Sequence, residues 1–229
     1  MEVLIKRSDS PWILLYVSLA IITVVLVQTD LFGRFNEHFP YFAGFIQFAV
    51  YATAGELFSM RVLRGAWVLN RATLFKAGSW GFSGLFVTLA FRVFSDGSQG
   101  AMDAGLLPFA GSALTLAFFT SCTNNIFFGP LHSSFIRVCC NYADLRYTEH
   151  QNVTVREAVN SVDWGELVNF TLFRTIPLFW IPVNTVGFLL PVHYRIVFAS
   201  VLSMAFGVLM TILKLRERRN QTGWTHTNQ

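Results

Sequence analysis

The sequence predicts an all-α polytopic membrane protein, a single domain of about six transmembrane helices with the N and C termini on the inside. Three observations predict it: a low charge content, a series of long apolar stretches, and an uneven distribution of Lys and Arg. Apolar residues make up 53% of the 229 residues and charged residues only 13%, whereas a soluble domain carries about a quarter charged residues. So few charges leave too little polar surface to cover a globule in water.

Six stretches are long and apolar enough to cross a membrane as helices, which takes about 20 residues for roughly 30 Å of hydrocarbon. They are residues 11–29, 39–60, 76–92, 104–131, 175–192 and 196–213. The third is bounded by Lys76 and Arg92, whose long side chains can reach the interfaces. The last two are separated only by His193, Tyr194 and Arg195, which predicts a tight helical hairpin.

The basic residues are distributed unevenly between the two sides that six alternating spans create. With the N terminus inside, the inside segments hold 14 of the 17 Lys and Arg, namely Lys6, Arg7, Arg61, Arg64, Arg71, Lys76, Arg137, Arg146, Arg156, Arg174, Lys214, Arg216, Arg218 and Arg219. The outside turns hold Arg34, Arg92 and Arg195. Because cations are enriched in the inside loops of membrane proteins, this distribution supports both the number of spans and the inside location of the termini.

The longest hydrophilic stretch, residues 137–174, falls on the inside. Thr154 and Glu157 have the spacing of a capping box, in which two side chains bond free backbone N–H groups at a helix start. Apolar residues then recur at helical spacing at Val155, Ala158, Val159 and Val162. We expect residues 153–170 to form an amphipathic helix at the inner interface; a soluble loop is the alternative.

A carboxylate, Glu56, lies within the second apolar stretch, near its inner end. A charge at the centre of a membrane costs about 2.5–3.5 kcal/mol or more. Glu56 is therefore expected either to face a pore or pair with a cation such as Arg61 or Lys76, or to reach the inner interface as an anchor.

Three asparagines, Asn124, Asn125 and Asn184, lie in apolar surroundings and need hydrogen-bond partners. They either line a polar path through the membrane or join helices by hydrogen bonds. Gly129-Pro130 predicts a kink or break, because proline lacks an N–H group and clashes with the preceding turn. Pro177 and Pro182 interrupt the fifth stretch and expose backbone carbonyls there.

Small residues recur at spacings that place them on one helix face. In the sixth stretch they are Ala199, Ser203, Gly207 and Thr211, and in the third they are Gly78, Gly81 and Gly84. Small side chains let two helix backbones approach closely. We expect both faces to contact neighbouring helices.

The remaining features predict no enzyme, cofactor, metal site or nucleic-acid partner. The cysteines, Cys122, Cys139 and Cys140, are odd in number and lack metal-ligand spacing. The motifs of serine hydrolases, zinc proteases, P-loops and dinucleotide-binding turns do not occur. The net charge is +4, but its cations lie beside apolar stretches rather than in one basic patch.

The hairpin between the last two stretches carries a recurring order of residues. Asn184 is followed by Pro191, then by Tyr194 and Arg195. The chain here resembles the C-terminal signature of the Mpv-seventeen family, which includes the peroxisomal membrane protein of twenty-two kilodaltons. Upstream, Gly55-Glu56 is similar to the family's Gly-Asp, and the segment 124–130 is similar to its Asp-Gln followed by Ala-Pro. The family's acidic residue and following Gln are replaced here.

The resemblance implies a small membrane protein of a bacterial cytoplasmic membrane or an organelle, with channel-like conduction of small solutes. The expected function is a small channel or solute-permeability protein, and the alternative is a non-conducting component that binds a protein partner or lipid. The expected surroundings are the lipid bilayer and a second copy of the chain or another membrane protein. The expected pore or polar-interior residues are Glu56, Asn124, Asn125 and Asn184, and the expected hinge or turn residues are Pro130, Pro177, Pro182, Pro191 and Arg195.

Overall fold

The computed structural model describes residues 9–149 and 152–226, and every regular element in these ranges is a helix. The elements are α1 (Ser10–Gln28), α2 (Leu31–His38), α3 (Pro40–Arg64), α4 (Arg71–Asp103), α5 (Ala113–Thr123), η2 (Asn124–Phe128), α6 (Gly129–Ala143), η3 (Asp144–Thr148), α7 (Val155–Asn160), α8 (Trp164–Glu166), η4 (Leu167–Trp180), α9 (Ile181–Leu189) and α10 (Val192–His226), where η marks a π-helix. The predicted all-α class is confirmed.

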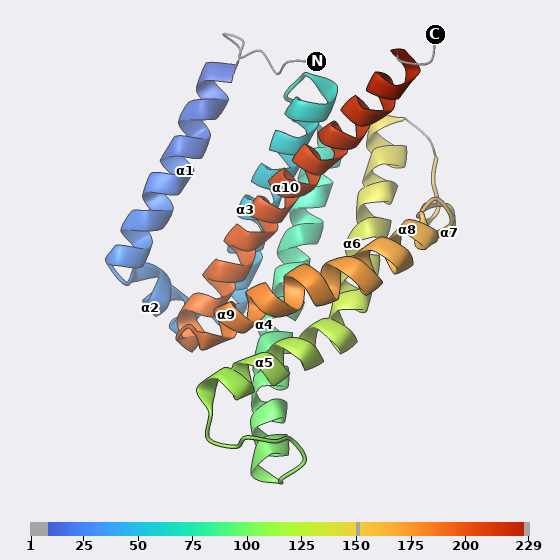
Figure 1. Cartoon of the computed structure of the whole chain (residues 1–229). Coiled ribbons are helices and arrows are strands. Elements are labelled where there is room, and N and C mark those ends of the chain that lie inside the picture. The colour runs from blue at the N-terminus through green and yellow to red at the C-terminus, as the bar shows by residue number, and fades with distance from the viewer. Residues whose placement is uncertain (1–8, 150–151, 227–229) are drawn as a thin grey trace.

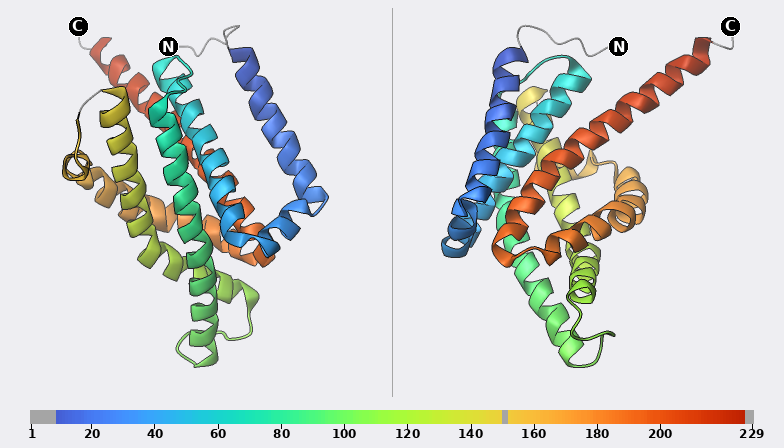
Figure 2. Two further views of the ribbon diagram at one scale, coloured as in Figure 1. Left: turned by 180° about the vertical axis from the view of Figure 1, so that it is seen from behind. Right: turned by 60° about the vertical axis from the view of Figure 1, so that its left-hand side comes forward.

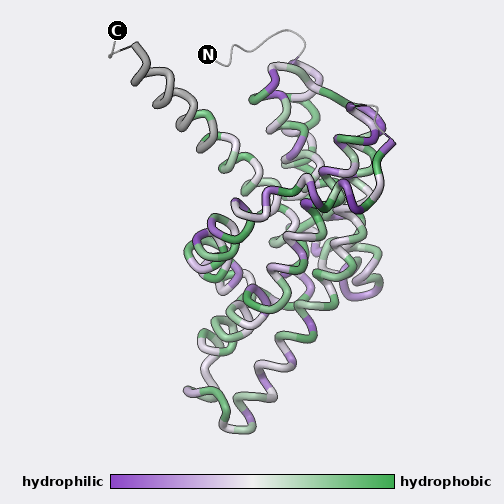
Figure 3. The backbone as a smooth tube through the Cα atoms, turned by 90° about the vertical axis from the view of Figure 1, so that its right-hand side faces the viewer, coloured by the Kyte–Doolittle hydropathy of each residue, from purple (hydrophilic) through white to green (hydrophobic). Residues whose placement is uncertain are grey.

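The long segments form a bundle in which the chain runs back and forth. The start of α1 and the end of α10 lie at the same end of the bundle, with α8, η4 and α9 crossing it obliquely (Figures 1 and 2). The more hydrophilic segments gather toward this end (Figure 3). Lys6 and Arg7, which contribute to the predicted charge bias, lie outside the described residues.

Four helical stretches are long and apolar enough to span a membrane: Ser10–Gln28, Arg71–Asp103, Trp164–Leu189 and Val192–Ile212. They correspond to the first, third, fifth and sixth predicted stretches. The second and fourth, 39–60 and 104–131, are not among them.

The centre of the bundle is built by α3, with α4 on one side and α10 on the other. Gly44 and Gly84 face each other so closely that a Cβ atom added to Gly44 would lie 2.8 Å from the Gly84 carbonyl oxygen. Gly81 likewise meets the Phe45 ring, at 2.9 Å from an added Cβ atom. Glycine is required here because two backbones share the space that a side chain would fill. Gly78 has nothing within 4 Å of an added Cβ atom, so the predicted glycine face contacts α3 only in part.

The small-residue face of α10 packs against α3, as predicted. A Cβ atom added to Gly55 would lie 2.9 Å from Met204 Cα. Ser59 Oγ donates a hydrogen bond to the Gly207 carbonyl at 3.2 Å and accepts one from Thr211 Oγ1 at 2.6 Å. Close packing and interhelical hydrogen bonds therefore act together at this contact.

The first helix, α1, lies at the periphery and buries none of its own residues. Its start is held by Asp9, which accepts hydrogen bonds from Arg61 Nε at 2.7 Å and Trp67 Nε1 at 2.7 Å. Trp12 stacks on Trp67 with ring centroids 4.6 Å apart, and Tyr16 donates to the Ala54 carbonyl at 2.5 Å. Side-chain contacts, rather than close backbone packing, attach α1 to α3.

The fourth predicted stretch begins too early, because residues 104–112 form a loop rather than a helix. Gly105, Phe109 and Gly111 have φ angles of 73°, 60° and 87°, and such left-handed conformations end an α-helix. Helix α5 starts after Ser112, whose Oγ accepts a hydrogen bond from Thr115 N at 3.3 Å.

The predicted amphipathic helix over 153–170 is wrong in extent. The capping box is present, since Thr154 N donates to Glu157 Oε2 at 2.7 Å, and the bonds from Thr154 lower the pKa of the Glu157 carboxyl. However, α7 stops at Asn160, and Asp163 caps a new helix by accepting from Glu166 N at 2.8 Å. The fifth apolar stretch therefore begins at Trp164 instead of residue 175, and the exposed Arg174 lies within it.

The predicted turn between the last two stretches is displaced by a few residues. Helix α9 ends at Leu189 and α10 starts at Val192, so His193, Tyr194 and Arg195 are helical. Proline at position 191 has no N–H group with which to continue α9, and its fixed φ suits a helix start.

Candidate functional site

A cavity of about 490 Å³ lies among α3, α4, η2, α6, η4, α9 and α10. All four side chains predicted to form a polar interior line it: Glu56, Asn124, Asn125 and Asn184. Three helical segments distant in sequence contribute them. The three asparagines lie together, whereas Glu56 shares Lys76 with Asp144, which is 20 residues farther along the continuous η2–α6–η3 helix than Asn124.

The cavity extends along the bundle rather than across it. Its lining follows α3 from Phe48 to Leu63, roughly 22 Å at 1.5 Å per residue. At the Phe48 end it meets a buried apolar cluster, the apolar layer, formed by Phe48, Val87, Ile196 and Ala199, with Phe91 packed against it. From this layer the cavity runs toward the end of α3 that lies near both termini (Figure 1).

Two of the three asparagines on the cavity wall join neighbouring helices by hydrogen bonds. Asn184 Nδ2 donates to Asn125 Oδ1 at 3.2 Å, and Asn125 Nδ2 donates to the Ser121 carbonyl at 2.8 Å. Ser121 Oγ also donates to the Ile181 carbonyl at 2.8 Å. These bonds hold α9 against α5 and η2. Asn124 differs, because its Oδ1 is buried without a hydrogen-bond partner.

The expected break at Gly129-Pro130 is instead a widened helical turn. The chain stays helical from α5 through η2 into α6, and Pro130 is the second residue of α6. A π-turn before a proline moves the carbonyl that the ring would strike in an α-helix. Pro182 follows η4 in the same way, and Pro177 lies within η4.

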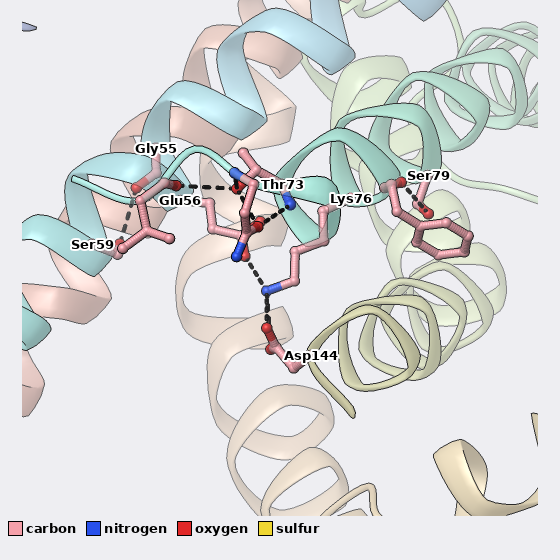
Figure 4. Close-up of polar contacts among 10 residues, drawn as sticks. Gly55, Glu56, Ser59, Thr73, Lys76, Ser79 and Asp144 are labelled. Carbon is pink, nitrogen blue, oxygen red and sulfur yellow. Dashed lines mark hydrogen bonds and ion pairs between the residues drawn. The ribbon is translucent and has the colours of Figure 1, made fainter. Parts of the chain in front are cut away.

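A charged triad borders the cavity at the level of Glu56. Lys76 Nζ lies 2.6 Å from Glu56 Oε1 and 2.9 Å from the Asp144 carboxylate. The Lys76 side chain reaches from α4 toward α3 and η3 (Figure 4), and only 7% of it is exposed. Of the two predicted cationic partners, Lys76 thus pairs with Glu56, whereas Arg61 pairs with Asp9 at 2.6 Å.

The charges around the cavity are largely compensated. Lys76 faces two carboxylates, so the triad carries a net charge of about −1 with its groups ionised. Arg137 also lines the cavity and pairs with Glu166 at 3.4 Å. The cavity therefore presents no uncompensated cation from these pairs, and its field weakly disfavours anions.

Two predicted turn residues lie at the opposite end of the bundle from the chain termini. Pro191 occupies the turn between α9 and α10. Arg195 Nε donates to the Leu190 carbonyl at 3.0 Å, its Nη1 donates to Ser95 Oγ at 3.2 Å, and its guanidinium lies 5.5 Å from the Phe188 ring centroid. These contacts fix the α9–α10 turn against α4, away from the cavity.

Sequence reasoning missed three contributors to the site: Trp80, His132 and Asp144. Trp80 and His132 line the cavity, and His132 Nε2 lies 2.6 Å from Ser83 Oγ. A single Trp or His in an apolar stretch is usually packing, so the sequence carried no signal for them. Asp144 stood in a hydrophilic stretch where a carboxylate needs no explanation.

Comparisons with protein-family models, with curated protein sequences and with solved structures find no match for this chain. Among the described residues, no group of three or more His, Cys, Asp or Glu side chains is placed to hold a metal ion. The cavity and its lining are therefore the observations on which a functional assignment can rest.

Proposed function

We propose that this protein is a small membrane channel or solute-permeability protein, with the cavity as its solute path and the apolar layer as its closed gate. The observation that carries the proposal is the convergence of Glu56, Asn124, Asn125 and Asn184 on one cavity. Polar side chains inside membrane proteins are costly and usually line a functional path or pair with one another. Here they do both.

The proposal includes the topology and the family. We propose that α3 and the continuous α5–η2–α6 segment cross the membrane together with the four apolar stretches, which gives six spans with both termini inside. The alternating chain direction supports this, because short connections between spans reverse the chain (Figure 2). We further propose that the protein is a divergent member of the Mpv-seventeen family, because of the residue order around Pro191 and Arg195.

A non-conducting membrane component that binds a partner or lipid is the second candidate. The apolar layer favours it, because Phe48 is only 2% exposed and packs into this buried cluster on the cavity wall. The two functions differ in whether solutes cross. Hydrophobic constrictions can gate a path by excluding water. Removing a side chain that packs on the apolar layer should widen the constriction and so distinguish the two functions.

The test is solute flux in liposomes with the wild type, Phe91→Ala and Leu89→Ala. Phe91 packs on the apolar layer, whereas Leu89 on the same helix is 45% exposed and serves as the matched control. We expect Phe91→Ala to raise the flux of small neutral solutes about tenfold, because a wider constriction admits water. Leu89→Ala should behave as the wild type. Vesicles that stay as tight as empty ones with both the wild type and Phe91→Ala would reject conduction.

A further inference from the structure

Two buried polar groups on the cavity wall lack hydrogen-bond partners in the structure. They are Asn124 Oδ1, an acceptor on η2, and Trp80 Nε1, a donor on α4. Elsewhere in the described part of the chain, three other buried polar atoms also lack partners, in Gln47, Thr53 and Thr120, but these residues do not line the cavity. Leaving a buried polar group unpaired costs about 1–3 kcal/mol. Asn124 is only 4% exposed, so bulk water does not offset this cost freely.

The rest of the cavity wall is mainly aromatic and aliphatic. Apolar members include Phe48, Phe128, Ile176, Trp180, Phe206 and Met210, contributed by α3, η2, η4 and α10. The volume of about 490 Å³ falls in the range of roughly 300–1,000 Å³ that is typical of sites for small organic ligands. An apolar site with a few unpaired polar groups fits a ligand that has a long apolar body and a small polar head.

The charges restrict the head group. Glu56 is bound to Lys76, and Arg137 to Glu166. These pairs leave neither Lys76 nor Arg137 free to bind an anionic head. A carboxylate only accepts hydrogen bonds, whereas a hydroxyl can donate one to the vacant acceptor on Asn124.

We propose that the cavity is a binding site for a neutral amphiphile with an apolar chain or ring body and a hydroxyl-type head group. The ligand's hydroxyl donates a hydrogen bond to Asn124 Oδ1, and its apolar body covers the aromatic wall. This inference rests on the proposed function, since it names the class of molecule that the same cavity takes.

Photolabelling in phosphatidylcholine liposomes tests the proposal with three matched probes: dodecan-1-ol, dodecanoic acid and dodecane, each carrying the same diazirine in its chain. We expect the alcohol to label residues of the cavity wall saturably, with competition by unlabelled dodecan-1-ol. The acid and the alkane should bind about five- to tenfold more weakly, because neither the carboxylate of the acid nor the alkane can donate a hydrogen bond to Asn124 Oδ1. Equal saturable labelling by all three probes, or labelling confined to the lipid-facing surface, would overturn the proposal.

Two variants sharpen the test. Asn124→Leu should weaken alcohol binding about five- to tenfold and leave alkane binding unchanged, because it removes the vacant acceptor. Gln99→Leu likewise replaces a carboxamide side chain by leucine, at an exposed position of α4 outside the cavity, and should have no effect. An Asn124→Leu protein that folds and binds the alcohol as tightly as the wild type contradicts the proposal. If this variant fails to fold, the three-probe comparison in the wild type still decides.

The outcomes also separate this inference from the proposed function. Saturable alcohol labelling without solute flux leaves the binding site in place and rejects conduction. Flux of small solutes without saturable labelling leaves conduction in place and rejects the amphiphile site.

Discussion

Two walls enclose the cavity, and they are built on different principles. The glycine-packed wall consists of α3, α4 and α10, where Gly44, Gly55 and Gly84 bring backbones into contact. The π-helical wall consists of η2, α6, η4 and α9, where Pro130, Pro177 and Pro182 accompany widened turns. Close backbone packing leaves little room for movement, whereas π-turns have weaker hydrogen-bond geometry and occur often at functional sites. The comparison indicates that the glycine-packed wall is a rigid frame and that the π-helical wall is the more adaptable of the two.

The largest expected effect comes from breaking the glycine-packed wall. Gly84→Leu should prevent stable folding, costing more than about 3 kcal/mol, since even an added Cβ atom overlaps the Gly44 carbonyl. Gly78→Leu, on the same helix with nothing within 4 Å, is the matched control. Thermal unfolding in detergent measures both. Equal melting temperatures for the two variants would show that the Gly44–Gly84 contact does not hold the frame.

A smaller effect is expected from the charged triad, which joins the glycine-packed wall to η3. Lys76→Met leaves Glu56 and Asp144 close together without their cation, and breaking such a partly buried pair costs about 3 kcal/mol. The double variant Lys76→Met with Glu56→Gln should regain part of this loss, because it also removes one unpaired carboxylate. Denaturation in detergent would measure the free energy of unfolding of the wild type and both variants. A double variant no more stable than Lys76→Met would contradict this role for the triad.

The smallest expected change in stability comes from the π-helical wall. Pro177→Ala returns an N–H group to η4 and should change stability by no more than about 1 kcal/mol, since the π-turns already accommodate the ring. We expect slower amide exchange across Leu167–Trp180 and unchanged exchange in α3. Pro191→Ala, in the α9–α10 turn, is the control and should leave exchange in η4 unchanged. Equal exchange rates in α3 and η4 of the wild type would remove the distinction between the walls.

The sequence by itself determined the helical class, the apolar stretches and the polar residues that matter. Lipid-length apolar runs and a low charge content are local properties, so they can be read without a fold. The capping box at Thr154 and Glu157 and the small-residue face around Gly207 are also local patterns, and the structure has both. Element boundaries were less predictable: the loop over 104–112 depends on left-handed residues that include Phe109, which carries no sequence signal for this conformation.

Only the tertiary structure decided how the polar residues are divided. Asn124, Asn125 and Asn184 look alike in sequence, yet two bond each other across helices and one is left unpaired on the cavity wall. Glu56 could have paired with Arg61, one turn along its own helix, or with Lys76 from α4. The bundle placed Asp9 beside Arg61 and left Lys76 for Glu56 and Asp144. Partner choice is a matter of which helices pack together, and no local pattern encodes it.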